Sequence, residues 1–209
     1  MKKFELTSEF ITNVLGAKLF RIKALIEFGD VSAGELGGYI EKEENLAQDG
    51  NAWVYGNAKV YGDAKVCGDA KVYGNAEVCG NAEVYGNAWV YGNAWVCGDA
   101  KVYGNAEVCG NAEVCGNAEV CGNAEVCGDA DYSTVKGFGR IFRTTTFFRK
   151  KDKDIGVSCG CFYGTLEEFR KKVKETHGES KTAKEYLMLA DLMEYKFSRE
   201  MDVEEEVNQ

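Results

Sequence analysis

Residues 50–61 read Gly-Asn-Ala-Trp-Val-Tyr-Gly-Asn-Ala-Lys-Val-Tyr and set the pattern for the middle of the chain. A glycine recurs at every sixth position from Gly50 to Gly128, followed each time by Asn or Asp and then Ala, and a valine recurs from Val54 to Val126. Residues two apart in an extended chain share a face, so the Ala and Val of each unit point the same way. Glycine adopts the positive φ that a sharp corner requires. Each hexapeptide therefore predicts a very short strand followed by a tight turn, and the array predicts a solenoid filled with alanine and valine.

The unit Val54-Tyr55-Gly56-Asn57-Ala58-Lys59 resembles that of the hexapeptide-repeat left-handed parallel β-helix family, and the match covers about half the chain. The resemblance implies a mainly β fold with three-sided coils of about 18 residues and a left-handed winding. A second resemblance spans nearly the whole chain. The order of N-terminal strand, repeat array and a module containing Val157–Phe169 is similar to uncharacterised proteins encoded by bacteriophages and prophages, and it implies no functional residue.

We predict three parts: an N-terminal β cap over residues 1–37, the hexapeptide β-helix over 38–131, and a C-terminal module over 132–209. In the cap, apolar residues alternate with polar ones between Phe20 and Phe28, which is the period of a half-buried strand. Residues 45–50 are interpreted as a degraded first repeat in which Leu46 replaces Ala and Gln48 replaces Val. Capping repeats of solenoids are commonly atypical.

The C-terminal module is predicted to contain a β-hairpin and two helices. Residues 141–148 and 155–163 are rich in β-branched and aromatic types, with a charged loop between them. A capping box at Thr165–Glu168 predicts a helix over 166–177. A second helix over 182–201 carries a wide apolar face, which we interpret as the element through which copies of the chain associate.

Residue composition argues against the enzymes best known from this type of fold. The chain has 209 residues and a single histidine, His177, outside the repeats. The acyltransferases that the β-helix resemblance implies use a histidine base, and the related carbonic-anhydrase-like enzymes need three histidine ligands. Cys159-Gly160-Cys161 lacks the second ligand pair of a zinc site. We therefore predict no catalytic residue, no metal and no cofactor. No apolar stretch reaches the roughly 20 residues of a membrane span, so we expect a cytoplasmic protein that does not enter a membrane.

Seven of the nine cysteines occupy the corner position that tyrosine fills in other repeats. With three repeats to a coil, Cys79, Cys97 and Cys115 stack on one side, within disulfide range. Because a cytosolic compartment keeps thiols reduced, we predict free, partly buried thiols.

The residues between Ala and Val point outward and form ladders along the solenoid. One ladder contains Trp53, Lys71 and Trp89, which predicts a lysine between two indoles. A second ladder alternates in charge through Lys65, Glu83, Lys101 and Glu119. The three tryptophans are predicted to be exposed, and they are candidate binding residues: Trp53, Trp89 and Trp95. The acidic residues of the last repeats are either a binding face or the product of recent duplication: Glu107, Glu113, Glu119, Glu125 and Asp131.

Charge is divided unevenly along the chain. Residues 50–135 carry four Lys against eleven acidic residues, and residues 136–178 carry eleven Lys and Arg against five. A basic cluster lies beside phenylalanines in the predicted hairpin: Arg140, Arg143, Arg149, Lys150 and Lys151. Basic residues beside aromatics can bind nucleic acid, and the alternative is a solvated hairpin.

Three hypotheses follow from the sequence. The first is a non-enzymatic scaffold of phage type that recognises a protein partner through a rigid acidic and aromatic surface. In a more specific form of this hypothesis, the acidic solenoid acts as a decoy of nucleic acid. It is expected to be a homo-oligomer, trimer or dimer. The second is a nucleic-acid-binding protein acting through the basic hairpin. The third is a hexapeptide-type acyltransferase, which the single histidine disfavours.

Overall fold

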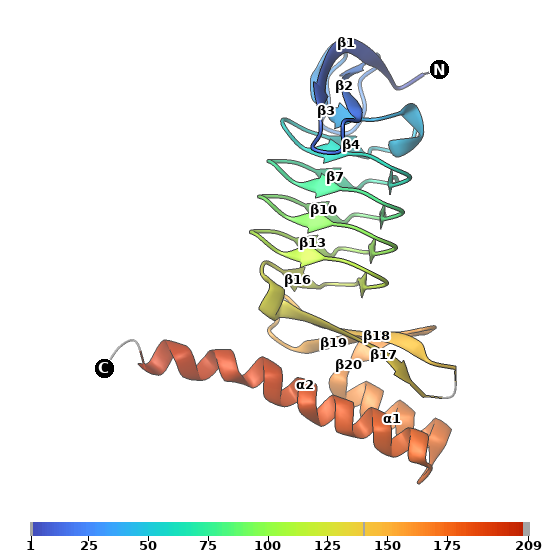
Figure 1. Cartoon of the computed structure of the whole chain (residues 1–209), viewed down its shortest axis with the longest axis vertical. Helices are drawn as coiled ribbons and strands as arrows, with labels where there is room; N and C mark the ends of the chain where they lie inside the picture. The colour runs from blue at the N-terminus through green and yellow to red at the C-terminus, as the bar shows by residue number, and fades with distance from the viewer. Residues whose placement is uncertain (1, 140, 207–209) are drawn as a thin grey trace. The chain divides into compact units, whose positions relative to one another are not determined.

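The computed structural model describes residues 2–139 and 141–206, with side chains described as far as residue 198. The chain forms two compact units (Figure 1). The first contains Met1–Asn123 and Cys127–Asp129, and the second contains Ala124–Val126 and Ala130–Gln209.

The first unit is built around a β-solenoid of two-residue strands, each an outward residue followed by an inward valine. Strands three repeats apart pair in parallel, as Trp89 does with Lys71 and Glu107. The expected mainly β solenoid is therefore confirmed. Its strands are β4 (Trp53–Val54), β5 (Lys59–Val60), β6 (Lys65–Val66), β7 (Lys71–Val72), β8 (Glu77–Val78), β9 (Glu83–Val84), β10 (Trp89–Val90), β11 (Trp95–Val96), β12 (Lys101–Val102), β13 (Glu107–Val108), β14 (Glu113–Val114) and β15 (Glu119–Val120).

Three parallel sheets form the sides of the solenoid. Their orders are β4-β7-β10-β13, β5-β8-β11-β14 and β6-β9-β12-β15. Every repeat Ala from Ala52 to Ala118 and every Val from Val54 to Val120 has an exposed fraction of zero. At the corners the glycines have positive φ, for example 73° at Gly74, where a Cβ would lie 2.9 Å from the carbonyl oxygen of Gly92. Glycine is required there both for its φ and for the close approach of the next coil.

The N-terminal cap is an antiparallel sheet of β1 (Phe4–Thr12), β2 (Lys18–Ala24) and β3 (Leu36–Ile40). β3 then pairs in parallel with β5, so the cap continues one side of the solenoid. The predicted strand over 20–28 is shorter than expected, because β2 ends at Ala24. β1 was not predicted, since its sequence does not alternate cleanly between apolar and polar residues.

The first coil is slightly longer than the others. Ile40 pairs with Val60 and Leu46 with Val66, and each of these pairs spans two more positions of the chain than the regular pair of Val54 with Val72. Leu46 therefore occupies a valine position, and the interpretation that it replaces Ala was wrong. In this coil the Gln48 side chain accepts a hydrogen bond from the Lys3 backbone N–H at 2.7 Å.

The second unit contains an antiparallel sheet and two helices. The sheet order is β17 (Tyr132–Phe138), β18 (Arg143–Arg149), β19 (Ile155–Cys159) and β20 (Phe162–Thr165). Strand β16 (Glu125–Val126) precedes the sheet in sequence, and a single turn of 3-10 helix lies at Asp129–Asp131. Another such turn, Glu43–Asn45, belongs to the first unit. The module therefore has four sheet strands where a hairpin was predicted: β17 was missed, and the predicted strand 155–163 is divided at Gly160, whose φ is 63°.

The helices are α1 (Leu166–His177) and α2 (Lys181–Glu206). α1 has the predicted bounds and capping box, with Thr165 accepting from the Glu168 N–H. The apolar face of α2 packs inside the module, where Ala190 and Phe197 join Phe147, Val157 and Phe169 in one core. That face is thus buried within its own unit and is not the association surface that we predicted. Neither of the described helices has both the length and the apolar composition of a membrane span.

Candidate functional site

Trp89 belongs to a group of three aromatic side chains on one edge of the solenoid, in which the two tyrosines are half-buried. Its side chain is 41% exposed. The Tyr73 ring contacts it edge-on at 6.3 Å and stacks on Tyr91 at 4.9 Å with parallel planes. We call Tyr73, Trp89 and Tyr91 the aromatic edge. The sequence contains the signal for the stacked tyrosines, because they occupy the same corner position in successive coils, but we did not use it.

Trp95 is also exposed, at 43%, as predicted. It lies on β11, on the side of the solenoid next to that of Trp89. Its indole N–H donates to the Cys79 sulfur at 3.1 Å, which holds the ring against its own side. Trp89 and Trp95 therefore present two fixed aromatic surfaces on neighbouring sides.

Trp53 is fully buried, so the prediction that it is exposed was wrong. Phe28 packs on its ring edge-on at 5.3 Å, and Phe4 does so at 6.1 Å. Both phenylalanines come from the N-terminal cap, which covers the first rung of this ladder. Trp53 is a core residue and is removed from the candidate site.

Lys71 does not lie between two indoles. Its ammonium is 5.9 Å from the centroid of the Trp89 ring and 5.9 Å from that of Tyr55, so a phenol takes the place expected for Trp53. It also forms an ion pair with Asp30 at 2.8 Å. The hydrogen bond from Lys71 lowers the pKa of the Asp30 carboxyl. The lysine side chain is thereby fixed beside the aromatic edge.

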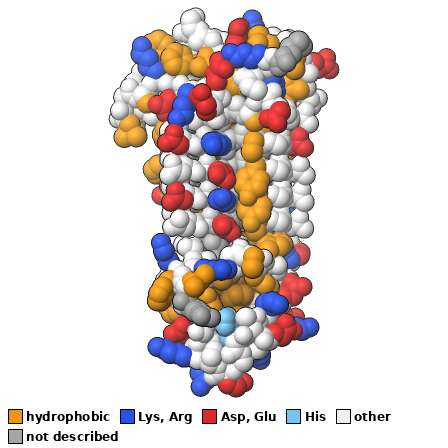
Figure 2. All heavy atoms as spheres, turned by 90° about the vertical axis from the view of Figure 1, so that its right-hand side faces the viewer, with side chains coloured by type: hydrophobic (Ala, Val, Ile, Leu, Met, Phe, Trp, Pro, Cys, Tyr) orange, Lys and Arg blue, Asp and Glu red, His pale blue; other side chains and the backbone are white. Residues whose placement is uncertain are grey.

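A charged ladder follows another side of the solenoid, as the repeat predicts. Figure 2 shows a column of alternating basic and acidic side chains next to a column of hydrophobic ones along the solenoid. The pairing of β6, β9, β12 and β15 places Lys65, Glu83, Lys101 and Glu119 in this alternation. Lys101 pairs with Glu83 at 3.3 Å, and this hydrogen bond raises the pKa of Lys101. Ion pairs of this exposed kind contribute little individually.

The acidic residues of the last repeats do not share one face of the solenoid. Glu107, Glu113 and Glu119 lie on β13, β14 and β15, which belong to three different sheets. Glu107 accepts a hydrogen bond from the Tyr91 hydroxyl at 3.0 Å. Glu125 and Asp131 belong to the second unit, where Asp131 pairs with Arg149. Glu107 is therefore the acidic candidate that borders the aromatic edge.

Four of the corner cysteines form disulfides: Cys97 with Cys115, and Cys109 with Cys127. The register of the coils places their Cα atoms 4.7 and 4.3 Å apart. The prediction of free thiols was therefore wrong for these four residues, whereas it is confirmed for Cys67 and Cys79. The prediction relied on a reducing cytosol, whereas the register of the coils brings the sulfur atoms of each pair together.

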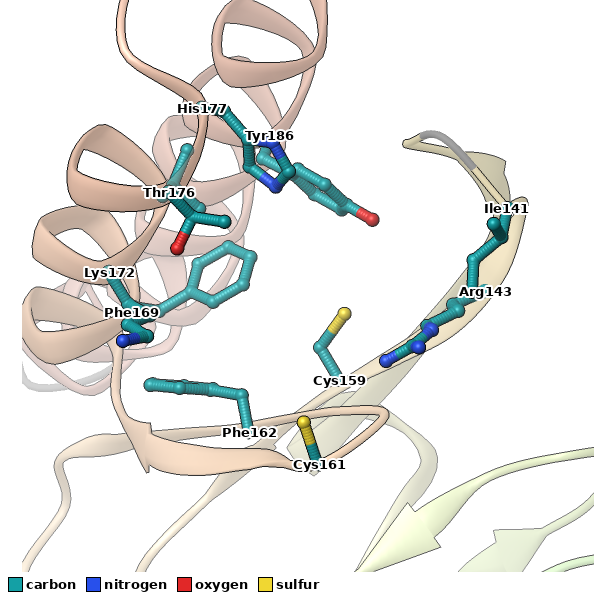
Figure 3. A pocket seen from close by; sticks show the side chains of 11 residues that line it. Ile141, Arg143, Cys159, Cys161, Phe162, Phe169, Lys172, Thr176, His177 and Tyr186 are labelled. Carbon is teal, nitrogen blue, oxygen red and sulfur yellow. The ribbon is translucent and has the colours of Figure 1, made fainter.

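Those of the predicted basic residues that the structure describes do not form one patch. Arg140 lies outside the described residues. Arg149 pairs with Asp131 at 3.3 Å and donates to the Phe197 carbonyl, and Lys150 pairs with two acidic neighbours in the loop. Arg143 points into a cavity on the helical side of the sheet (Figure 3). Lys151 is exposed. Much of the predicted positive surface is thus used in contacts within the module.

Comparison with known proteins finds similarity in the repeats. A family model described as YdcK Beta solenoid repeat matches residues 82–98. The repeat is similar to that of YdcK. The protein named "Uncharacterized acetyltransferase YdcK" from Escherichia coli (strain K12) is 42% identical over 62 residues, which cover 26% of this chain and 19% of that protein. The match with YdcK thus spans about a fifth of its length, and the phage origin stays a prediction.

Proposed function

We propose that this protein is a non-enzymatic solenoid scaffold that binds a protein partner through the aromatic edge. The observation that carries the proposal is the exposed Trp89 in edge-on contact with Tyr73, which itself stacks on Tyr91. Tryptophan and tyrosine are enriched among residues that dominate binding energy. Because these rings are fixed by the pitch of the coils, a partner would order few side chains on binding, which favours affinity.

Charge around the edge favours a partner with basic groups on its contact surface. Residues 50–135 carry a net charge of −7, from four Lys and eleven acidic residues, and Glu107 lies directly beside Tyr91. Such a field accelerates the approach of a positively charged partner. A decoy of nucleic acid is the special case in which that partner is itself a nucleic-acid-binding protein.

Association of copies remains part of the proposal, through a different surface from the one predicted. Helix α2 carries a second apolar stripe of Met188, Leu192 and Tyr195, which are 71%, 54% and 56% exposed. Their spacing of four and three positions places them on one helical face. A dimer or trimer formed through this stripe would be reduced to monomers by Leu192→Lys, as measured by light scattering.

Position-specific photo-crosslinking tests the partner. A benzophenone amino acid replaces Trp89 in one variant and Lys101, on a different sheet, in the matched control, and each is irradiated in cells that express the protein. We expect one predominant protein adduct at position 89 that is absent at position 101. Adding Tyr73→Ser to the first variant should reduce its yield severalfold. Equal adducts at both positions, or none at position 89, would contradict the proposal.

Two other functions receive less support. Nucleic-acid binding requires free basic groups, whereas Arg149 and Lys150 are paired with carboxylates. The nucleic-acid-binding hypothesis would be supported by DNA binding that weakens steeply with salt and is lost in the double variant Arg143→Gln/Lys151→Gln. Acetyl transfer is suggested by the name of YdcK, although the matched segment covers only 26% of this chain. Acetyl-coenzyme A consumption that disappears in His177→Ala would support it.

A further inference from the structure

The second unit contains a cavity that none of the functions above uses. Its volume is about 360 Å³, and it lies between α1, α2 and strands β18 to β20 (Figure 3). Sites for small molecules in proteins begin at about this size. In Figure 2 the only histidine of the chain is visible beside a hollow surrounded by hydrophobic side chains.

One wall of the cavity is aromatic. Phe162 comes from β20, Phe169 from α1 and Tyr186 from α2. Their rings contact one another, with centroids 5.5 Å apart for Phe162 and Phe169, and 5.7 Å apart for Phe169 and Tyr186. Aromatic faces and edges at such distances offer a flat ligand both stacked and edge-on contacts. The wall therefore fits a planar apolar group.

The polar groups around the cavity are basic or neutral. Arg143 and Lys172 carry the cations, and His177 lies at the end of α1. Among the described residues that line the cavity there is no Asp or Glu. Within the described part of the chain, Lys172 reaches Glu175 only at 3.9 Å, and Arg143 has no ion pair. A charged site of one sign, next to an apolar wall, selects ligands of the opposite sign.

The turn beneath Arg143 is shaped to hold its guanidinium in place. Gly160 has a φ of 63°, and a Cβ built there would collide with Arg143 Nη1. Glycine at position 160 therefore leaves the space that the Arg143 guanidinium occupies. Burial raises the pKa of the Tyr186 hydroxyl to about 12, so this group is a neutral hydroxyl at physiological pH. A carboxylate in the cavity would therefore meet a forked cation without a competing negative charge.

We propose that this cavity binds a small carboxylate whose body is a planar apolar ring system. The ring lies against Phe162, Phe169 and Tyr186, and the carboxylate accepts paired hydrogen bonds from Arg143. Lys172, at the mouth, adds long-range attraction.

Calorimetry with 2-naphthoate as the probe tests the site on the full chain. We expect saturable one-to-one binding that Arg143→Gln weakens at least tenfold, as the loss of a charge-assisted pair implies. The neutral 2-naphthamide should bind the wild-type protein about tenfold more weakly than naphthoate, and should bind wild type and Arg143→Gln equally. Lys171→Gln, which removes an exposed charge from α1 outside the cavity, is the matched control and should leave the affinity unchanged.

A second variant keeps the test valid if Arg143→Gln folds poorly. Thr176 is exposed and lines the cavity, so Thr176→Trp should fill its mouth without disturbing the core and should abolish binding. Bound naphthoate should also slow alkylation of Cys159, which lines the cavity, but not of Cys67 in the solenoid. Absence of binding at millimolar naphthoate, or equal binding by wild type, Arg143→Gln and Thr176→Trp, would overturn the proposal.

Discussion

The early coils of the solenoid, residues 51–92, and the late coils, residues 93–123, have the same interior but are joined along their corners by different chemistry. Five of the seven corner positions from residue 55 to residue 91 are tyrosine, whereas five of the six from residue 97 to residue 127 are cysteine. The early corners stack rings, as Tyr73 does on Tyr91. The late corners contain both disulfides of the described structure. A repeat thus fixes the coil, and its variable positions decide how neighbouring coils are held together.

The first prediction tests whether the interior is equally packed in both regions. Ala76 and Ala100 precede β8 and β12, each of which pairs with a strand of the coil before it and of the coil after it, and both alanines have an exposed fraction of zero. Ala76→Leu and Ala100→Leu should each lower the free energy of unfolding by about 3 kcal/mol, because a closed coil cannot widen to accept three more carbons. Urea unfolding measures both. Lys65→Leu, which adds an outward leucine, should cost far less. A large difference in unfolding free energy between the two alanine variants would show that the early and late coils are not equally well packed inside.

The second prediction concerns the late coils and the disulfides that join them. Cys97→Ser/Cys115→Ser should lower the free energy of unfolding by about 2 to 3 kcal/mol, because the disulfide closes a loop in the unfolded chain, with a sequence separation of 18. Reducing agent should produce a loss at least as large in the wild type and none in a variant without both disulfides. Hydrogen exchange should increase around β14 and remain unchanged around β5. Cys67→Ser, at a corner with a free thiol, is the matched control and should have little effect.

The third prediction concerns the start of the early coils, where Lys3 closes the open end of the solenoid. Its ammonium donates to the carbonyls of Asp49, Gly50 and Ala52 at 3.3, 3.4 and 3.0 Å. Burial lowers the pKa of Lys3 from 10.5 to about 8. Between these values the folded protein binds fewer protons than the unfolded chain, so stability must rise with pH.

This rise should reach about 2 kcal/mol between pH 7 and pH 9.5, which is the integral of the linkage relation over that window. Lys3→Met keeps the apolar stem and removes the titrating group, so its unfolding free energy should lack this slope. Urea unfolding of both proteins across the window gives the difference directly. Parallel curves for the two proteins would mean that Lys3 keeps its proton throughout.

The elements that were predicted correctly are those that a short stretch of the sequence specifies by itself. The coils were predicted because each hexapeptide carries its own constraint, a glycine corner and two inward residues, and needs no distant residue to specify it. Helix α1 was predicted for the same reason, since Thr165 and Glu168 cap it locally. Features that depend on distant segments were missed. Trp53 has the same local sequence as Trp89, and only packing by Phe4 and Phe28 buries it.

The candidate site was predictable only in part. Spacing placed Trp89 and Trp95 outward, and the ladder register was obtained directly from the repeat. The cavity could not be predicted, because its residues come from three strands, the turns beside them and two helices of the second unit. Arg143 was assigned to a basic surface on the basis of its sequence neighbours. Its direction depends on the turn at Gly160, which lies beyond the end of the next strand, β19.

The smallest predicted effect compares ion pairs along the two regions. Lys59 and Glu77, in the early coils, approach to 2.6 Å with side chains 31% and 32% exposed. Lys101, in the late coils, reaches Glu83 at 3.3 Å, and both side chains are 42% exposed. Partly exposed pairs contribute about 0.2 to 1 kcal/mol, and the closer, less solvated pair should be at the upper end. Lys59→Gln should therefore cost more than Lys101→Gln in urea unfolding at low ionic strength. Both losses should shrink in about 0.5 M NaCl, where screening weakens the interaction between exposed charges. Equal losses that do not respond to salt would show that the packing of the lysine stems, and not their charge, holds the coils together.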